Sequence, residues 1–556
     1  MKIKHLWVSK YKNVEDIDLT FKSDLITLLV GKNGLGKSNL IEILALIFRD
    51  LDLIEKSEEL ESWAYDKQHF EFKITYECKK SEVTIHCLEG TFTAWEKAIN
   101  SKKQFTALSL KEFIERKRGE FLPNYIIGYY SGENKRIRDI IRPYEENNWK
   151  LLKKNEGTTN GLRRMFFAEN HHSQLLLFTL LLYQEQNTDI NLKKRATKLF
   201  KEYTTIGKVE DIGLELKNPS WYDRRNKELS RRSVYQLVEN IIGKEKLSFP
   251  FWNAKGISDK IFRFLYENSK LDPIYYEEKS SFDGRREVVE KLSFNPIDYK
   301  SAGKSVYKIF GHPINFFEAL ESLVIIESLD KIVLSVLAKN NSKTKLNYRE
   351  FSEGEQQLIT VLGLILITGK DDCLFLLDEP DTHLNPDWQR DYVKLITHFN
   401  LNDKNSHIFI ATHSPLIVQA GEKADIILFH KNSKGKIVAE KNVMNIHNYR
   451  IDQVLASKYF EFKNTRPPNI DSFMLKREKL LSKPKISSKD LNELKVIENN
   501  TGLLPNGETL EDFFAMSSIR ILAEKLKTND TNKKKQKTSN SKVRSSKSSK
   551  FRARKV

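Results

Sequence analysis

The chain has 556 residues, enough for more than one folded unit with a large core. Hydrophobic residues make up 39% of it and charged residues 30%, as in a globular protein. The longest apolar run, Leu175–Tyr183, is far shorter than the ~20 residues that span a bilayer, so we expect a buried helix there, no membrane segment and a cytoplasmic location. Cys78, Cys87 and Cys373 have the spacing of neither a disulfide framework nor a zinc site, which predicts reduced core thiols.

The net charge of +18 is concentrated at the C-terminus. From Lys533 onward there are eleven Lys or Arg residues and no acidic residue. This Ser-, Lys- and Arg-rich composition predicts a disordered basic tail at 528–556. Such a tail can contact nucleic acid non-specifically through phosphates, since Phe551 is its only aromatic residue and cannot form a row of stacking groups. The alternative is a tail that only keeps the protein in solution.

Residues 1–155 are predicted to form an N-terminal lobe rich in strands. An apolar run at 24–30 ends in a glycine-rich turn, and a helical pattern follows it. Apolar and polar residues alternate at 69–78 and again at 81–88, which is typical of half-buried antiparallel strands. Further strands are predicted at 3–8, 16–21 and 122–132.

Residues 156–315 carry apolar residues three to four positions apart with basic residues between them, which predicts a helical insert without a sustained heptad repeat. Strand–helix alternation returns at 316–445, the predicted C-terminal lobe. Polar helices at 446–527 are expected to form a C-terminal region that can bind a partner. Within the C-terminal lobe, buried strands are predicted at 373–380 and 406–415, a helix at 386–399 and an edge hairpin at 424–441.

The segment "GKNGLGKS" matches the phosphate-binding pattern G-x-x-x-x-G-K-[ST], and it lies between a predicted strand and a predicted helix. Glycines let backbone amides curl around phosphates, Lys37 can reach the outer phosphates, and Ser38 can hold Mg²⁺. A chance glycine-rich turn is the weaker interpretation in this context. The residues predicted to bind nucleotide here are Gly31, Asn33, Gly34, Gly36, Lys37, Ser38 and Asn39.

Two predicted strands of the C-terminal lobe end in polar residues. Asp378 is expected to hold the metal ion, and Glu379 beside it to act as general base on the attacking water. His413 ends the next buried strand, which should lie beside the strand of Asp378. Strand ends of this kind bind ligands in α/β sheets, so His413 can contact the terminal phosphate.

Together these motifs resemble the head of an ABC-type ATPase. The resemblance implies an α/β fold, with a mixed sheet, flanking helices and an antiparallel β lobe. The segment "FSEGEQQ" then resembles the ABC signature through Ser352, Gly354 and Glu355, with Glu353 in place of the usual first glycine. In that family two heads dimerise around ATP, and each signature binds the nucleotide of the other head. The loop after Glu379 would cross the dimer, beginning at Asp381.

The branch is indicated by Ser38-Asn39-Leu40 and by "THLNP", which resemble the SMC, RecF and OLD-like ATPases. Within it, "YYSGEN" at 129–134 adds a resemblance to the Septu-type PtuA ATPases of bacterial anti-phage defence, also found with retrons. The resemblance implies a separate HNH nuclease as partner. The usual glutamine is missing from 129–134, and Ser131, Glu133 or Asn134 can take its place. Position alone also allows adenine contacts near Lys12 and Asn13.

We expect no nuclease site in the chain itself. Residues 440–556 are too short and too basic for the Toprim domain of OLD nucleases. The paired His171 and His172 lack a following Asn and His at suitable spacing, so we interpret them as helix-surface residues. The sequence therefore predicts a cytoplasmic bacterial enzyme that binds ATP and Mg²⁺, dimerises, hydrolyses ATP and regulates an HNH nuclease. The alternatives are a RecF-like DNA clamp in repair or recombination and a nucleotide-binding scaffold with little turnover.

Overall fold

The computed structural model contains two compact units, Met1–Glu461 and Phe462–Val556, which we describe separately. The predicted tail at 528–556 lies outside the described residues. The structure describes residues 1–22, 25–65, 70–132, 135–153, 164–169, 171–219, 221, 251–270, 274–280, 287–339, 344–368, 372–400, 406–462, 470–483, 486–501, 514–516 and 518–519.

The first unit is built on a seven-stranded mixed sheet in the order β18-β17-β3-β16-β15-β8-β9. All neighbours in this sheet are parallel except the edge hairpin β17–β18. The carboxyl ends of β3, β8, β15 and β16 therefore meet at one edge of the sheet. The strands are β3 (Ile26–Gly31), β8 (Tyr125–Tyr130), β9 (Met165–Ala168), β15 (Cys373–Asp378), β16 (Ser406–Ala411), β17 (Asp425–Lys431) and β18 (Ile437–Lys441).

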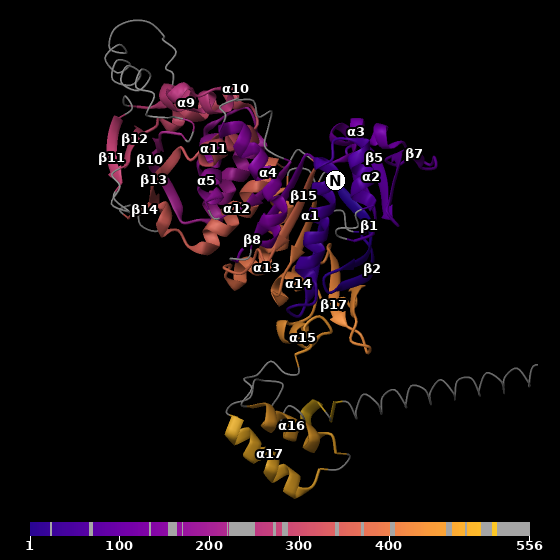
Figure 1. Cartoon of the computed structure of the whole chain (residues 1–556). Coiled ribbons are helices and arrows are strands. Elements are labelled where there is room, and N and C mark those ends of the chain that lie inside the picture. The colour runs from indigo at the N-terminus through magenta and orange to yellow at the C-terminus, as the bar shows by residue number, and fades with distance from the viewer. Residues whose placement is uncertain are drawn as a thin grey trace, which may run out of the picture. The chain divides into compact units, whose positions relative to one another are not determined.

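The apolar run of β15 is continuous because both faces of the sheet are covered. Leu374 and Leu376 belong to the core shared with α1 (Lys37–Leu53). Phe375 and Leu377 belong to the core on the opposite face. Figure 1 shows α1 on one side of β15, and α5 and α12 on the other. Helices α4 (Arg136–Lys153), α13 (Pro386–Phe399), α14 (Pro415–Ala420) and α15 (Ile451–Ala456) complete this body.

The N-terminal lobe carries the predicted antiparallel sheet, in the order β2-β1-β4-β5-β6-β7. In β4 every second residue is buried, which confirms the predicted alternation. Cys78 and Cys87 are free and buried in this lobe. The α/β fold with a mixed sheet and a separate antiparallel lobe is thus confirmed. The elements are β1 (Lys2–Tyr11), β2 (Val14–Thr20), α2 (Ser57–Tyr65), β4 (Phe72–Cys78), β5 (Ser81–Leu88), β6 (Thr91–Ala98), β7 (Thr106–Leu108) and α3 (Leu110–Arg116).

The insert at 156–315 contains helices, as predicted, but a purely helical insert is wrong. Strand β9 of this range belongs to the main sheet. Strands β10, β11 and β12 join β13 and β14, which follow the range, in a five-stranded antiparallel sheet in the order β11-β12-β10-β13-β14, here called the insert sheet. The strands β10 and β13 of this sheet pair across more than a hundred residues of sequence. The local spacing of apolar residues therefore does not reveal the sheet. The elements are α5 (His172–Glu185), α6 (Ile190–Tyr203), β10 (Ile206–Lys217), α9 (Gly256–Asn268), β11 (Ile274–Ser280), β12 (Glu287–Phe294), α10 (Tyr299–Phe310), α11 (Pro313–Ile325), β13 (Leu329–Ala338) and β14 (Lys345–Asn347).

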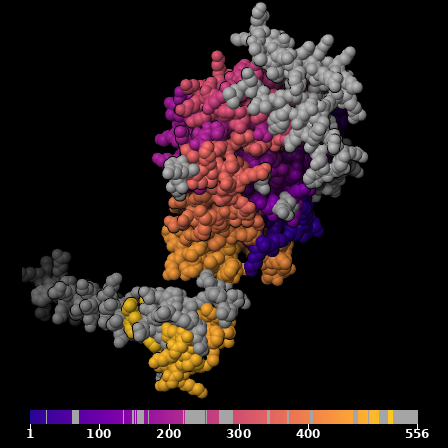
Figure 2. Space-filling model, turned by 90° about the vertical axis from the view of Figure 1, so that its left-hand side faces the viewer, coloured from indigo at the N-terminus to yellow at the C-terminus, as the bar shows by residue number. Residues whose placement is uncertain are grey.

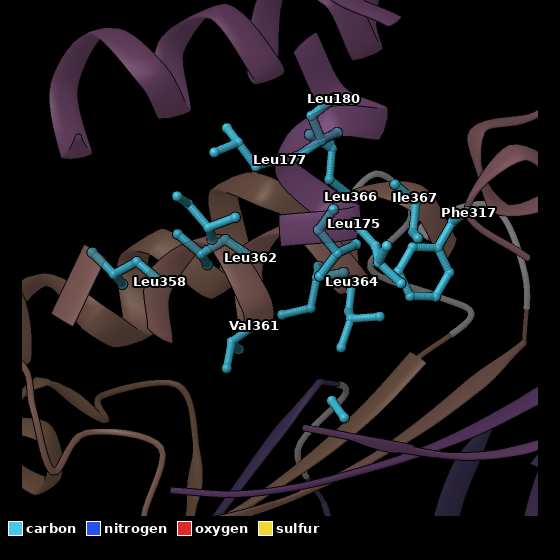
Figure 3. Close-up of a cluster of buried hydrophobic side chains, with 14 of the residues drawn as sticks. Leu175, Leu177, Leu180, Phe317, Leu358, Val361, Leu362, Leu364, Leu366 and Ile367 are labelled. Atoms are coloured by element: carbon cyan, nitrogen blue, oxygen red, sulfur yellow. The ribbon is translucent and has the colours of Figure 1, made fainter. Parts of the chain in front are cut away.

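The insert shares its core with the C-terminal lobe. Helix α12 (Glu353–Thr368) begins in the signature and packs against α5 and α11. Figure 3 shows Leu175 and Leu180 of α5, Leu362 of α12 and Phe317 of α11 in this cluster. Figure 2 shows the insert in magenta and the C-terminal lobe in orange packed together without a break. The signature helix is therefore held between the main sheet and the insert.

The second unit is a small helical region formed by α16 (Asp471–Leu481) and α17 (Ser488–Thr501). Among its described residues, Leu480, Leu494 and Ile497 form a buried apolar cluster. The predicted C-terminal region began at residue 446, but 446–461 belong to the first unit. No helix in the described part of the chain is long and apolar enough to cross a membrane.

Candidate nucleotide-binding site

A cavity of about 430 Å³ opens at the carboxyl edge of the main sheet. It lies at the ends of β8, β15 and β16 and at the start of α1, as expected for a ligand site in an α/β sheet. Of the predicted residues, nine line this cavity: Asn33, Gly34, Gly36, Lys37, Ser38, Asn39, Asp378, Glu379 and His413. Lys12 and Asn13 line it as well, at the position suggested for adenine contacts.

Two of the loop glycines are required by the backbone. Gly31 has φ +145°, and a Cβ there would lie 2.4 Å from the carbonyl oxygen of Phe429. Gly36 has φ +100°, and a Cβ there would lie 2.7 Å from Val14 Cγ2. Both sites exclude a side chain, so the loop can curve tightly into the start of α1. The free amides of that helix N-terminus and its partial positive charge then favour an anion in the cavity.

Lys37 is almost completely buried, at 5% exposure. Its ammonium donates to the carbonyl oxygen of Gly31 at 2.9 Å and lies 2.8 Å from Nε2 of His413. Burial lowers the pKa of Lys37 to about 8, against the charges of Asp378 and Glu379. Burial and the nearby Lys37 also lower the pKa of His413. A neutral His413 can therefore accept a hydrogen bond from the Lys37 ammonium through Nε2. An arriving phosphate can then replace His413 as the partner of Lys37.

Asp378 and Ser38 place two oxygen atoms side by side in the cavity. Asp378 is 5% exposed, and burial raises the pKa of its carboxyl to about 6, although a hydrogen bond from Ser38 acts in the opposite direction. A buried carboxylate beside a hydroxyl provides the hard oxygen donors that Mg²⁺ prefers, and Mg²⁺ is usually held by one or two carboxylates together with phosphates. The two residues thus fit the metal ion predicted for them.

Glu379 has a strained backbone with φ +50°, a region that non-glycine residues rarely adopt. Its amide donates to the carbonyl oxygen of Ala411 at 2.8 Å, which ties the end of β15 to β16. Its carboxylate Oε1 lies 3.6 Å from His413 Nε2, and 37% of the side chain is exposed. A half-exposed carboxylate in the cavity can reach a water molecule, which suits a general base.

The signature residues Ser352, Gly354 and Glu355 do not line the cavity. Ser352 is exposed at the start of α12. Gly354 is buried against the loop after Glu379, where a Cβ would lie 2.7 Å from the carbonyl oxygen of His383. An exposed signature outside its own cavity is compatible with action on a second chain.

Asp381 does not line the cavity either. Its side chain is 6% exposed and accepts from Thr412 Oγ1 at 3.0 Å. Contact between Asp381 and the nucleotide of a second chain stays a prediction. The substitute for the missing glutamine is also still open. Ser131 Oγ lies 2.8 Å from Thr382 Oγ1, whereas Glu133 and Asn134 lie outside the described residues.

Three polar lining residues were not predicted from the sequence, namely Glu42, Tyr130 and Arg136. Glu42 accepts from Tyr11 Oη at 2.8 Å and from Lys12, and it pairs with Arg136 at 3.8 Å. The spacing of Glu42, four residues after Ser38 on one helix face, is a signal that would have found it. Tyr130, at the end of β8, lies opposite Asp378 in the register of the parallel strands β8 and β15. Burial raises the pKa of Tyr130, and the negative charges of Glu379 and Asp378 add to the effect.

The prediction for His172 is wrong. It was predicted on a helix surface, but it is 2% exposed, and its Nδ1 accepts from the amide of Glu169 at 2.7 Å. Its ring packs 4.7 Å from Phe166, because the start of α5 is inserted beneath the main sheet's edge strand β9. His171 keeps a partly exposed side chain. Among the described residues, no group of three or more His, Cys, Asp or Glu side chains is arranged to hold a metal ion.

A glycine-rich phosphate loop before a helix, with acidic residues and a histidine at neighbouring strand ends, defines the nucleotide site of an ATPase domain. Comparison with protein families agrees, because a model of the AAA ATPase domain matches residues 1–418. The chain belongs to this AAA ATPase domain family.

Two characterised relatives are similar to the chain. The Septu protein PtuA of Bacillus mycoides (strain KBAB4) is 22% identical over 216 residues, which cover 37% of this chain and 28% of PtuA. The Retron Vc95 probable ATPase of Vibrio cholerae serotype O1 biovar El Tor is 22% identical over 432 residues, covering 75% of this chain and 71% of the relative. The predicted resemblance to Septu-type and retron-associated ATPases is thus confirmed.

Two solved structures of SMC heads align with the chain, both with low TM-scores. The SMC head domain from Thermotoga maritima is 10% identical and covers 79% of this chain and 99% of its own, with a TM-score of 0.28. An SMC head bound to the C-terminal winged-helix domain of ScpA is 13% identical and covers 79% of this chain and 98% of its own, with a TM-score of 0.31.

The site predicts that nucleotide affinity depends on pH in two opposite ways. The raised pKa of Asp378 means that its carboxyl takes up a proton near pH 6, instead of near its ordinary value of 3.8. Because a protonated carboxyl is a poor metal ligand, affinity for Mg²⁺·ATP should fall as the pH drops below about 6. The lowered pKa of Lys37 means that ATP affinity without Mg²⁺ should fall as the pH rises above about 8.

The fall in affinity at acid pH and the fall at alkaline pH can both be measured by titrating a fluorescent ATP analogue at about pH 5 to pH 9, with and without Mg²⁺. In Asp378→Asn the difference between the two titrations should disappear. If the affinity of Asp378→Asn for Mg²⁺·ATP still falls at acid pH, the assignment of Asp378 as metal ligand is contradicted.

Proposed function

We propose that the protein is an ATPase that hydrolyses ATP between two copies of its head and uses this cycle to regulate a nuclease in bacterial anti-phage defence. The observation that carries the proposal is the convergence of Lys37, Asp378, Glu379 and His413 on one cavity beside the phosphate loop. The names of the two relatives support the biological setting, since one is a Septu protein and the other a retron ATPase.

The residues divide the work of hydrolysis among them. The phosphate loop binds the β- and γ-phosphates through its amides, and Lys37 moves from His413 to the phosphates. Ser38 and Asp378 would hold Mg²⁺, which supplies positive charge to the phosphates when bound. Glu379 accepts the proton of the attacking water. Once Lys37 has left Nε2 of His413, the tautomer of His413 that carries its proton on Nε2 can donate a hydrogen bond to the terminal phosphate. The signature of a second copy closes the site around that phosphate.

The proposal is tested by comparing ATP turnover of the purified protein with that of Lys37→Ala. Wild type should hydrolyse ATP in Mg²⁺, whereas Lys37→Ala should lose phosphate contacts and nucleotide binding. Lys32→Ala is the matched control, because Lys32 is an exposed residue of the same loop and does not line the cavity. Turnover in Lys37→Ala equal to wild type would contradict the proposed site.

We place the nuclease-binding surface on the second unit. Its helices expose Leu475, at 58%, and Val496, at 56%. Exposed apolar side chains can mark an interaction surface, and a partner that covers these two would remove them from water. The HNH nuclease implied by the Septu resemblance is the occupant that we propose.

The surface is tested by co-purification of the protein with the HNH nuclease proposed as its partner. Leu475→Glu combined with Val496→Glu should release the nuclease while leaving ATP binding unchanged, because neither residue belongs to the first unit. Asn492→Glu is a control for each single variant, since it adds one negative charge at an exposed position of α17 without removing an apolar contact. Full retention of the nuclease by the double variant would place the interface elsewhere, most plainly on the insert.

A further inference from the structure

Glu355 connects the signature to the insert. Its side chain is buried, and carboxylate Oε2 accepts from the amide of Ser352 at 3.0 Å and from the Ser352 hydroxyl at 2.9 Å. The amide of Glu355 donates back to that hydroxyl at 3.3 Å, so the two residues form a capping box at the start of α12. The other carboxylate oxygen, Oε1, accepts from the backbone amide of Thr205, 150 residues upstream in the insert.

Lys339 holds the turn in which Thr205 lies, between α6 and β10. Its ammonium donates to the carbonyl oxygens of Phe200 and Lys201, both at 2.6 Å, and to that of Thr204. These are carbonyls at the end of α6, which have no partner within the helix. The amide of Lys339 donates to the carbonyl oxygen of Thr205 at 3.1 Å. Lys339 thus fixes the helix end through its side chain and the turn through its backbone amide.

The charges of Lys339 and Glu355 also interact. Burial lowers the pKa of Lys339, and the negative charges of Glu355 and Glu202 oppose that shift. Glu355 is therefore held by a neutral backbone donor and by a nearby cation, both on the insert side.

The insert sheet ends at this contact. Ile206 of β10 pairs with Ala338 of β13 as the last pair of the longest ladder in the sheet, and Thr205 and Lys339 are the residues next to this pair. Any tilt of the sheet would move the Thr205 amide away from Glu355. Since Glu355 orients the hydroxyl of Ser352, a change in the insert would be passed to the signature.

We propose that Lys339 and the backbone amide of Thr205 are positioning groups for the signature serine, and that the insert sheet controls through them how well Ser352 can bind the phosphate of a second copy. The inference rests on the proposed function, because it concerns a step of ATP hydrolysis between two chains. The competing explanation is that the contact only stabilises the fold.

The first test is turnover by Lys339→Met, which keeps the aliphatic stem but removes the donors. Nucleotide binding should be unchanged, since Lys339 does not line the cavity, while kcat should fall about tenfold or more, because a misplacement of about 1 Å can cost 10²-fold. Lys339→Arg restores donors and should recover most of the rate. Lys331→Met removes an exposed lysine from β13, the strand that Lys339 follows, and should behave as wild type.

The second test distinguishes positioning from a general loss of stability. Lys37→Ala keeps an intact signature and Lys339→Met keeps an intact phosphate loop, so mixing them should restore turnover above that of either variant. Mixing Lys339→Met with Ser352→Arg should restore nothing, because both signatures are impaired. If wild type itself does not hydrolyse ATP, the proposed function fails. If wild type is active and Lys339→Met is equally active, or is not complemented by Lys37→Ala, this inference fails alone.

Discussion

Glu379→Gln is expected to slow ATP hydrolysis by ~10²–10⁴-fold while leaving ATP binding intact, because this is the usual cost of losing a general base. Glutamine keeps the size of the side chain and its ability to hydrogen-bond, but it cannot accept the proton of the attacking water. The contact between Lys37 and His413 does not involve Glu379, so the phosphate loop should stay competent. The ATP-bound dimer should therefore accumulate.

The measurement combines single-turnover hydrolysis with a measurement of the molecular mass of the protein in the presence of ATP, which detects the dimer. Glu379→Asp provides a second variant, because it keeps the basic group but shortens its reach and should retain part of the rate. His413→Ala should slow hydrolysis by a smaller factor, since it removes a hydrogen bond but no base. Hydrolysis at the wild-type rate by Glu379→Gln would mean that another group activates the water.

Ser352→Arg is expected to abolish hydrolysis between two chains while each chain still binds ATP. Ser352 is exposed and does not line its own cavity, so an arginine there leaves the phosphate loop untouched but obstructs the approach of a second copy. Ser352→Ala loses the same helix cap, which should cost about 1 kcal/mol of stability in both variants. It also loses the hydroxyl proposed to contact the phosphate, so it should lower turnover without obstructing the second copy. Only the arginine should prevent closure of the dimer.

Mixing Ser352→Arg with Lys37→Ala should restore activity. In a mixed dimer, the intact phosphate loop of one chain meets the intact signature of the other, and the second site is defective in both parts. If chains pair at random and sites act independently, equal amounts should give about a quarter of wild-type turnover, since half of the dimers carry one working site of two. Turnover of Ser352→Arg alone at the wild-type level would show that the signature does not act on a second chain.

Local sequence was sufficient for the phosphate loop and the strands that carry the site. Glycines at Gly31 and Gly36 are required by backbone geometry that no other residue adopts easily, so their spacing is a reliable signal. The apolar runs of β15 and β16 predicted buried strands because a strand covered on both faces has no polar position. The pairing of these two strands then brings Glu379 and His413 to the same cavity.

Tertiary structure alone decided the features that depend on distant segments. Pairing of β10 with β13 leaves no trace in local periodicity, because each strand's partner is more than a hundred residues away. The same holds for the contact between Thr205 and Glu355 and for the burial of His172 under neighbouring side chains. A sequence pattern reports which face of an element is apolar, but it does not report which element covers that face. For this protein, the sequence therefore determined the nucleotide loop and its acidic strand ends, and only long-range packing determined how the insert reaches the signature.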